Sequence, residues 1–149
     1  MNVLYREWTE VDCKAVAALE KKCFADPWSL EMVNSSFSES HFFGYVAENE
    51  GDLVGYVGMS LVFDTADVLL VAVEEKFRGR GIATEHLNIS FIRARDSGGE
   101  RAMLEVDTKN ISAIYCYNRL GFEIISERKN YYGENKDAFI MEKCLLNDL

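Results

Sequence analysis

The amino-acid sequence predicts an α/β protein of the α+β type, built on one mixed sheet of about seven strands with helices on both faces. The main observation is the order of periodic segments, β-α-α-β-β-β-α-β-α-β-β, in which strand and helix patterns are interleaved. The second is Val68–Val73, which is almost wholly apolar, as expected for a strand covered on both faces. Because 149 residues suffice for one core and no low-complexity tract divides them, we expect residues 1–149 to form a single domain.

The first third of the chain predicts one strand and two helices. Val3–Trp8 has a strand pattern, and Thr9–Asp12 resembles a capping box that starts a helix running to about Phe24. Ser29 follows a proline break and is placed to cap a second, short helix that ends near Phe37.

The middle of the chain predicts a hairpin, a buried strand and a helix. Phe42–Glu48 and Leu53–Phe63 flank Asn49-Glu50-Gly51-Asp52, which is a strong hairpin signal. Val68–Val73 is the next strand, and Ile82 to about Arg95 is a helix.

The last third predicts strand, helix, strand and strand. Arg101–Asp107 alternates as a strand, and Asn110–Leu120 has helical spacing, with Gly121 just past its end as a C-terminal glycine should be. Two final strands are expected near Glu123–Asn130 and Asp137–Leu145.

Composition excludes several classes of protein. The hydrophobic fraction of 48% excludes disorder, and no apolar run approaches the roughly 20 residues that a membrane span needs. The N-terminus lacks a charged start followed by an apolar core, so we expect no secretory signal. The cysteines have neither zinc-site nor disulfide-framework spacing, which favours reduced thiols in the cytoplasm. They are Cys13, Cys23, Cys116 and Cys144.

The net charge of −9 argues against nucleic-acid binding, because contacts to phosphates need a basic surface. The same charge suits a cationic partner, such as an amine or a basic peptide. Solubility alone is an equally good explanation of the acidity.

The segment from Val71 to Thr84 carries the clearest functional signal. An apolar strand runs into the loop Arg78-Gly79-Arg80-Gly81, which opens directly into a helix. Glycine allows the backbone to approach a ligand closely, and the first turn of a helix offers unpaired N–H groups. The segment could therefore cradle a phosphate or pyrophosphate, the alternative being an ordinary turn with solvated arginines. Its spacing matches neither the nucleotide-binding P-loop nor the dinucleotide fingerprint.

Glu105 is the first candidate catalytic residue. It lies inside the predicted strand Arg101–Asp107, on the face opposite Leu104. A carboxylate there is costly unless it is paired or faces a cleft, where partial desolvation would make it a better base. Both a structural salt bridge and a catalytic base remain open.

Tyr117 is the second candidate. At 100° per residue it lies near the centre of a helical face shared with Ala113 and Leu120, whereas Tyr115 lies on roughly the opposite side. An inward tyrosine can be a core residue whose hydroxyl has a partner, or a phenol that donates a proton to a leaving group.

The remaining polar candidates give weaker signals. Asn110 is a good helix N-cap. His41 and His86 belong to no recognisable triad, and we expect both on the surface. Tyr131 and Tyr132 either line a substrate groove or pack the last hairpin.

These motifs together resemble the GCN5-related N-acetyltransferase superfamily, whose acetyl-coenzyme-A motif is Arg/Gln-x-x-Gly-x-Gly/Ala. Arg78, Gly81 and Ala83 fill its fixed positions. Within the superfamily the chain is most similar to the bacterial ribosomal-protein-alanine N-acetyltransferases. Further segments match that family in order and spacing: Pro27–Ser29, Leu104–Val106, Asn110 with Ala113 and Tyr117, Leu120–Phe122, Arg128–Tyr132 and Asp137–Met141.

The resemblance implies a mostly antiparallel sheet and a set of site residues. Glu105 would be the general base and Tyr117 the general acid, with no metal. The implied acetyl-CoA contacts are Val71, Ala72, Val73, Arg78, Gly79, Arg80, Gly81, Ile82, Ala83, Thr84 and Asn110. The implied substrate contacts are Trp28, Tyr131 and Tyr132. The chain departs from the family at Glu74-Glu75, where an acidic-proline step is common, and at Leu70, which replaces a polar residue.

The resemblance also implies direct transfer of acetyl, in a ternary complex, to the N-terminal α-amine of a protein, expected to be a basic small-subunit ribosomal protein in the cytoplasm. An α-amine has a pKa near 8 and a lysine side chain near 10.4. Deprotonation of an α-amine acceptor at neutral pH therefore costs about 3.4 kcal/mol less than deprotonation of a lysine. The rivals are a small-molecule amine acceptor (a polyamine or antibiotic) and a non-catalytic acyl-CoA-binding sensor. The sequence leaves the oligomeric state open, with a monomer as the default expectation.

Overall fold

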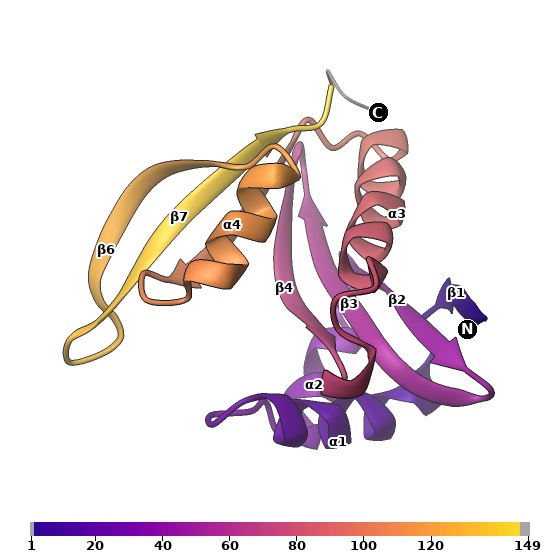
Figure 1. Ribbon diagram of the computed structural model, residues 1–149. Coiled ribbons are helices and arrows are strands. Elements are labelled where there is room, and N and C mark those ends of the chain that lie inside the picture. Colours follow the sequence, from indigo (N-terminus) through magenta and orange to yellow (C-terminus); the bar gives the residue numbers. More distant parts are fainter. Residues whose placement is uncertain (1, 147–149) are drawn as a thin grey trace. The chain divides into compact units, whose positions relative to one another are not determined.

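The computed structural model describes residues 2–146 and confirms the predicted order of elements (Figure 1). The elements are β1 (Val3–Glu7), α1 (Cys13–Cys23), α2 (Leu30–Phe37), β2 (Phe42–Asn49), β3 (Asp52–Val62), β4 (Thr65–Val73), α3 (Ile82–Asp96), β5 (Arg101–Asp107), α4 (Ile111–Arg119), β6 (Glu123–Gly133) and β7 (Lys136–Cys144). Two short 3-10 helices, Glu10–Asp12 and Glu75–Phe77, precede α1 and α3. In the part of the chain that is described, no helix is long and apolar enough to cross a membrane.

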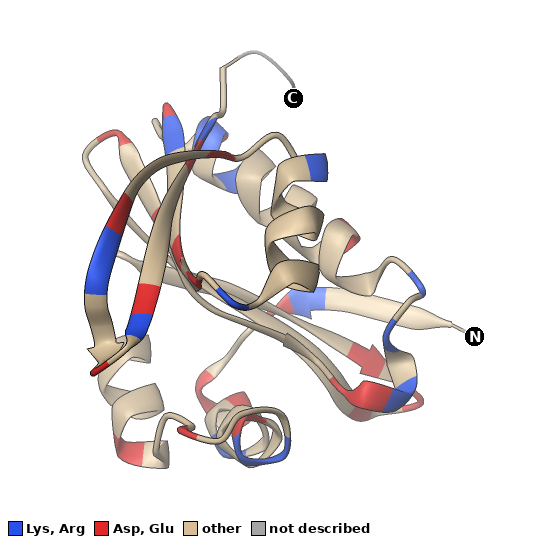
Figure 2. Ribbon diagram, turned by 60° about the vertical axis from the view of Figure 1, so that its left-hand side comes forward, with Lys and Arg blue, Asp and Glu red and all other residues tan. Residues whose placement is uncertain are grey.

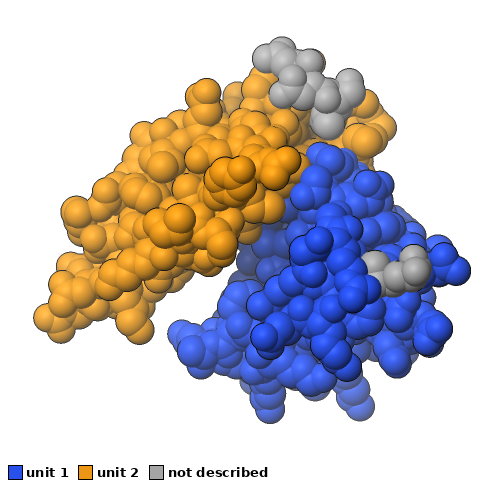
Figure 3. All heavy atoms as spheres, viewed as in Figure 1, with its two compact units in different colours: residues 1–61, 68–90 blue, residues 62–67, 91–149 orange. Residues whose placement is uncertain are grey.

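The strands form a mixed, mostly antiparallel sheet in the order β1-β2-β3-β4-β5-β7-β6. The pairs β1–β2, β2–β3, β5–β7 and β6–β7 are antiparallel. Strand β4 runs parallel to β5 over three residue pairs, from Thr65↔Arg101 to Asp67↔Met103. Two compact units can be distinguished: unit 1 comprises residues 2–61 and 68–90, and unit 2 comprises residues 62–67 and 91–146 (Figure 3).

In unit 1, helices cover both faces of the strands (Figure 1). On one face the buried residues of α1 and α2 pack against β2, β3 and β4. The buried residues of this cluster, from the helices, the strands and the segment after β1, include Trp8, Val16, Leu19, Val33, Val46, Tyr56, Leu70 and Ala72. On the other face Ile82, at the start of α3, packs with Ala47, Val54 and Val73. The prediction of helices on both faces is therefore confirmed for this unit.

Local hydrogen bonds explain where the helices of unit 1 begin. The Ser29 hydroxyl accepts the N–H of Met32 at 3.2 Å, which caps α2 as predicted. The Asp12 carboxylate accepts the N–H of Thr9 at 2.7 Å and both guanidinium nitrogens of Arg6 at 2.8 Å. Asp12 thus serves in a capping box and ties the start of α1 to β1.

The hydrophobic centre of unit 2 is aromatic. The ring of Phe122, which follows α4, lies 5.7 Å from that of Phe91 in α3 and 5.8 Å from that of Tyr117 in α4. The ammonium of Lys143 in β7 lies 5.9 Å from the centre of the Phe91 ring, so this buried cation faces an aromatic surface.

Two predictions from the sequence were wrong. His86 was expected on the surface, but it is fully buried beside the Tyr5 ring, 5.1 Å away. The reason is helical spacing: His86 is four residues from Ile82 and from Ser90, and all three are buried. The strand around Leu69 was expected to be covered on both faces, but the Leu69 side chain is 38% exposed.

Candidate active site

The loop between β4 and α3 in unit 1 has the backbone geometry expected of an anion cradle. Gly79 and Gly81 have φ values of +78° and +80°, which lie in the left-handed region. A Cβ added at either glycine would have no atom within 4 Å, so conformation and not space requires glycine there.

The start of α3 leaves amides available to an anion. The N–H of Glu85 bonds to the carbonyl of Gly81 at 3.0 Å, which begins the hydrogen-bond pattern of the helix. The amides of Ile82, Ala83 and Thr84 precede it and cannot have an i−4 partner within the helix. They are therefore available to a phosphate or pyrophosphate group, whose binding here stays a prediction.

Arg78 shapes this loop through its side chain. Its Nε donates to the Val73 carbonyl at 2.8 Å, and its Nη2 lies 3.5 Å from the Cys23 thiol. The guanidinium of Arg80 lies 5.6 Å from the centre of the Phe77 ring. Arg78 thus holds the end of β4 in place.

The segment Val71–Val73 lies past the last β4–β5 pair, Asp67↔Met103. Backbone groups on that edge of β4 are suited to align an extended ligand as an additional strand would be aligned.

Glu105 lies in β5 of unit 2, and its side chain is exposed. Within residues 2–146 it forms no ion pair, which removes the structural salt bridge as its explanation. Partial desolvation raises the pKa of Glu105, Asp67 raises it further, and Arg128 opposes the rise. A carboxylate of this kind is a stronger base than an ordinary glutamate.

Tyr117 lies on α4, half-buried against Phe122. Burial is the main reason why its pKa is raised to about 12. The phenol therefore keeps its proton near neutral pH, as a proton donor must. Tyr115, on the other side of the helix, is 63% exposed, which confirms the predicted helical faces. Asn110 is the N-cap of α4, its Oδ1 accepting the N–H of Ala113 at 3.2 Å.

Tyr131 and Tyr132 lie at the end of β6 and are both exposed, with their ring centres 5.0 Å apart. Desolvation and the neighbouring Glu105 charge raise the pKa of Tyr132 to about 12. Neither ring is buried in the hairpin, and their contact with a substrate stays a prediction.

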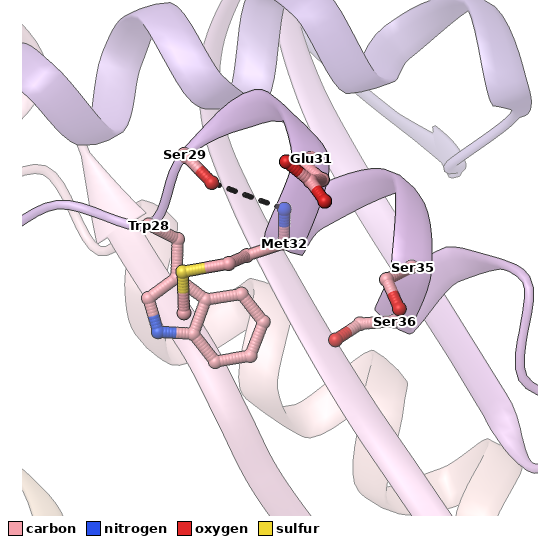
Figure 4. A pocket seen from close by; sticks show the side chains of 6 residues that line it. All are labelled: Trp28, Ser29, Glu31, Met32, Ser35 and Ser36. Atoms are coloured by element: carbon pink, nitrogen blue, oxygen red, sulfur yellow. Dashed lines mark hydrogen bonds between the residues drawn. The ribbon is translucent and has the colours of Figure 1, made fainter.

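Trp28 lines a surface hollow of about 470 Å³ beside α2, together with Glu31 and Met32 (Figure 4). The N–H of Trp28 donates to Glu20 Oε1 at 3.0 Å, and the Tyr56 hydroxyl donates to the other oxygen of this carboxylate. The segment before α2 is thus fixed by a buried acid.

Sequence reasoning missed Glu20 and Asp67. Glu20 follows Val16 by four residues on the buried face of α1, and Asp67 directly precedes the apolar run Val68–Val73 of β4. For Glu20 the available signal was a charged residue at a position that helical periodicity assigns to the interior, and for Asp67 it was a carboxylate inside a strand, on the face of the exposed Leu69.

Comparisons with known proteins agree with this arrangement. Residues 13–122 match the family model described as the acetyltransferase (GNAT) family. The chain is 32% identical over 142 residues to the N-alpha-acetyltransferase RimI of Mycobacterium tuberculosis, covering 91% of this chain and 88% of that protein. It is 28% identical over 133 residues to the ribosomal protein bS18-alanine N-acetyltransferase of Escherichia coli, covering 87% and 89%. The crystal structure of the ribosomal-protein-S18-alanine N-acetyltransferase from Escherichia coli superimposes with a TM-score of 0.91 at 23% identity, covering 99% of both chains.

The family match spans most of the chain, and the fold agrees with it. The chain belongs to the GNAT family of acetyltransferases and is an N-acetyltransferase.

Proposed function

We propose that this protein is a single N-acetyltransferase domain, residues 1–149, that transfers acetyl from acetyl-CoA to the N-terminal α-amine of a protein in the cytoplasm. The observation that carries the proposal is the pair of proton-transfer groups in unit 2. Glu105 is a partly desolvated carboxylate without an ion pair, and Tyr117 is a phenol that keeps its proton.

The donor would be held by backbone and by the loop that Arg78 shapes. Val71, Ala72 and Val73 would align the pantetheine arm along the edge of β4. The amides from Gly79 to Thr84 would bind the pyrophosphate, with Arg80 contributing positive charge and Asn110 a further contact. The positive φ of Gly79 and Gly81 supports this assignment.

The chain's groups then have distinct tasks in the reaction. Glu105 takes the proton of the α-ammonium, directly or through a water, and the amine nitrogen attacks the thioester carbon. The Val73 amide would stabilise the oxyanion that develops. The attacking nitrogen loses its second proton to solvent, and Tyr117 gives its proton to the departing thiolate as the C–S bond breaks. No covalent bond to the enzyme is needed.

Several observations support a protein α-amine as the acceptor. The α-amine loses its proton more easily than lysine, so one carboxylate suffices as base. The net charge of −9, with acidic segments on both units, suits a basic acceptor (Figure 2). One relative is named an N-alpha-acetyltransferase and another a ribosomal protein bS18-alanine N-acetyltransferase. These names support a small-subunit ribosomal protein as the acceptor. Trp28, Tyr131 and Tyr132 would contact it.

The test is release of coenzyme A, measured with a thiol reagent, from acetyl-CoA and three acceptors. These are a basic peptide that starts with alanine and contains no lysine, the same peptide with a blocked N-terminus, and the polyamine spermidine. We expect release with the free peptide only. Faster release of coenzyme A with spermidine would indicate that the acceptor is a small-molecule amine. Binding of acetyl-CoA without release would indicate a non-catalytic sensor.

A further inference from the structure

Asp67 and Glu105 lie on the same face of the sheet in unit 2. Asp67 pairs with Met103 at the end of the β4–β5 ladder, and residues paired across adjacent strands point to the same face. Glu105 is two residues beyond Met103 in β5 and shares its face. The two carboxylates are therefore diagonal neighbours on adjacent strands.

The charges that face Glu105 are mostly negative. From β4 comes Asp67, and from β5 Asp107, which lies two residues further on the same face. From β6 come Arg128 and Tyr132, and from β7 comes Glu142, which is paired with Met103. Two cations lie on this face: Arg128, which forms no ion pair with Glu105 within the described residues, and Arg101 of β5, which pairs with Asp64 at 2.8 Å. The local field thus favours the protonated form of Glu105.

The position of the Asp67 carboxylate costs free energy of folding. Its neighbours Ala66 and Val68 are buried, and residues 2–146 offer its carboxylate neither an ion pair nor a hydrogen bond. A partly buried acid without partners destabilises the fold, and such groups cluster at functional sites.

We propose that Asp67 is a positioning residue for acetyl transfer that acts through Glu105: its negative charge makes Glu105 the stronger proton acceptor, without touching the acceptor amine. This inference rests on the proposed function, in which Glu105 is the general base. Burial raises the pKa of Asp67, and the Asp67 charge raises that of Glu105, so the two carboxylates titrate as a coupled pair. A base whose pKa lies closer to the working pH removes a proton from an amine more effectively.

The experiment combines ¹³C NMR titration of the Glu105 carboxyl with the pH dependence of kcat/KM. The variants are Asp67→Asn, which removes the charge and keeps the shape, and Asp67→Glu, which restores the charge. Asp96→Asn removes a carboxylate at the end of α3, where its ion-pair partner is its neighbour Arg95, and is the matched control. Thermal melting verifies folding, and we expect Asp67→Asn to be at least as stable as the wild type.

We expect Asp67→Asn to move the Glu105 titration and the acidic limb of kcat/KM to lower pH by about 0.5 to 1 unit. The plateau of kcat should fall a few-fold, with the KM for acetyl-CoA unchanged, since a weaker base slows the proton transfer only. Asp67→Glu should restore both pH profiles, and Asp96→Asn should leave them unmoved.

A Glu105 titration at the wild-type pH in Asp67→Asn would overturn the inference and leave the proposed function standing. A Glu105→Gln variant with the wild-type rate and pH profile would instead remove Glu105 as the base, and with it the proposed mechanism and the role of Asp67. The two failures are distinguishable, because the NMR titration does not depend on activity.

Discussion

The hydroxyl of Tyr56 in β3 donates a hydrogen bond to the carboxylate of Glu20 in α1, and both side chains are buried. The second oxygen of that carboxylate accepts the N–H of Trp28. Burial is the main reason why the pKa of Tyr56 is raised, so the phenol stays protonated and remains a donor. One buried acid therefore connects α1, the sheet and the segment that presents Trp28.

Glu20→Ala should lower the free energy of unfolding by about 2–3 kcal/mol, because it leaves the buried Tyr56 hydroxyl and the Trp28 amide without partners. Tyr56→Phe should cost less, since Glu20 keeps its bond to Trp28. Urea denaturation measures both. A change below about 0.5 kcal/mol for Glu20→Ala would show that the bonds make no net contribution.

Gly81→Ala should cost about 1 kcal/mol of stability from its positive φ, and it should weaken acetyl-CoA binding several-fold because the loop amides must shift. Gly98→Ala is the matched control: Gly98 also has a positive φ and open space around its Cβ, but it lies past the end of α3. Isothermal titration calorimetry should show weaker binding for Gly81→Ala only. Equal affinities in the two variants would argue against the cradle.

Tyr117→Phe should slow acetyl transfer by about 10- to 100-fold, because the leaving thiolate loses its proton donor. The affinity for acetyl-CoA and the melting temperature should change little, since the ring still packs against Phe122. Tyr115→Phe, on the exposed side of the same helix, should keep the wild-type kcat. If both variants turn over at the wild-type rate, Tyr117 is not the acid.

His86 predicts a specific dependence of stability on pH. Burial lowers its pKa to about 4 from the ordinary 6.5, so between these values the unfolded chain binds a proton that the folded chain does not. The free energy of unfolding should therefore fall as the pH drops through this window, by about 2–3 kcal/mol, and His86 should contribute no pH dependence above it.

The comparison that isolates this contribution is urea denaturation of the wild type and of His86→Gln at pH 7, 5.5 and 4. The carboxylates titrate in both proteins, so the difference between them reports on His86. His41→Gln, which changes an exposed histidine, serves as the control. A variant that loses as much stability as the wild type between pH 7 and 4 would contradict the assignment.

Much of the fold could be predicted because its signals are local. The Ser29 cap, the Asn49–Asp52 turn and the glycine after α4 each mark a boundary by their own chemistry, and the strand Arg101–Asp107 was predicted with its correct ends. The 3-10 helix Glu75–Phe77 was not predicted, because a single turn has too few residues to show a period.

The site was predicted less completely, because its electrostatics depend on groups distant in sequence. Glu105 and Tyr117 stood out by position, but the influence of Asp67 on Glu105 follows from a parallel pairing between β4 and β5. To predict that His86 is buried, one must compare its position on α3 with that of Ile82, which lies on the same face of the helix. The family resemblance supplied the proposed roles of the residues, which spacing alone left open.

The measurement that tests the central claim most directly is fragmentation mass spectrometry of a basic peptide that begins with alanine and contains one internal lysine, after incubation with the protein and acetyl-CoA. We predict one acetyl group, on the α-amine. Acetyl on the lysine side chain, or no transfer to the peptide while acetyl-CoA still binds, would contradict the assignment of this protein as an N-terminal acetyltransferase.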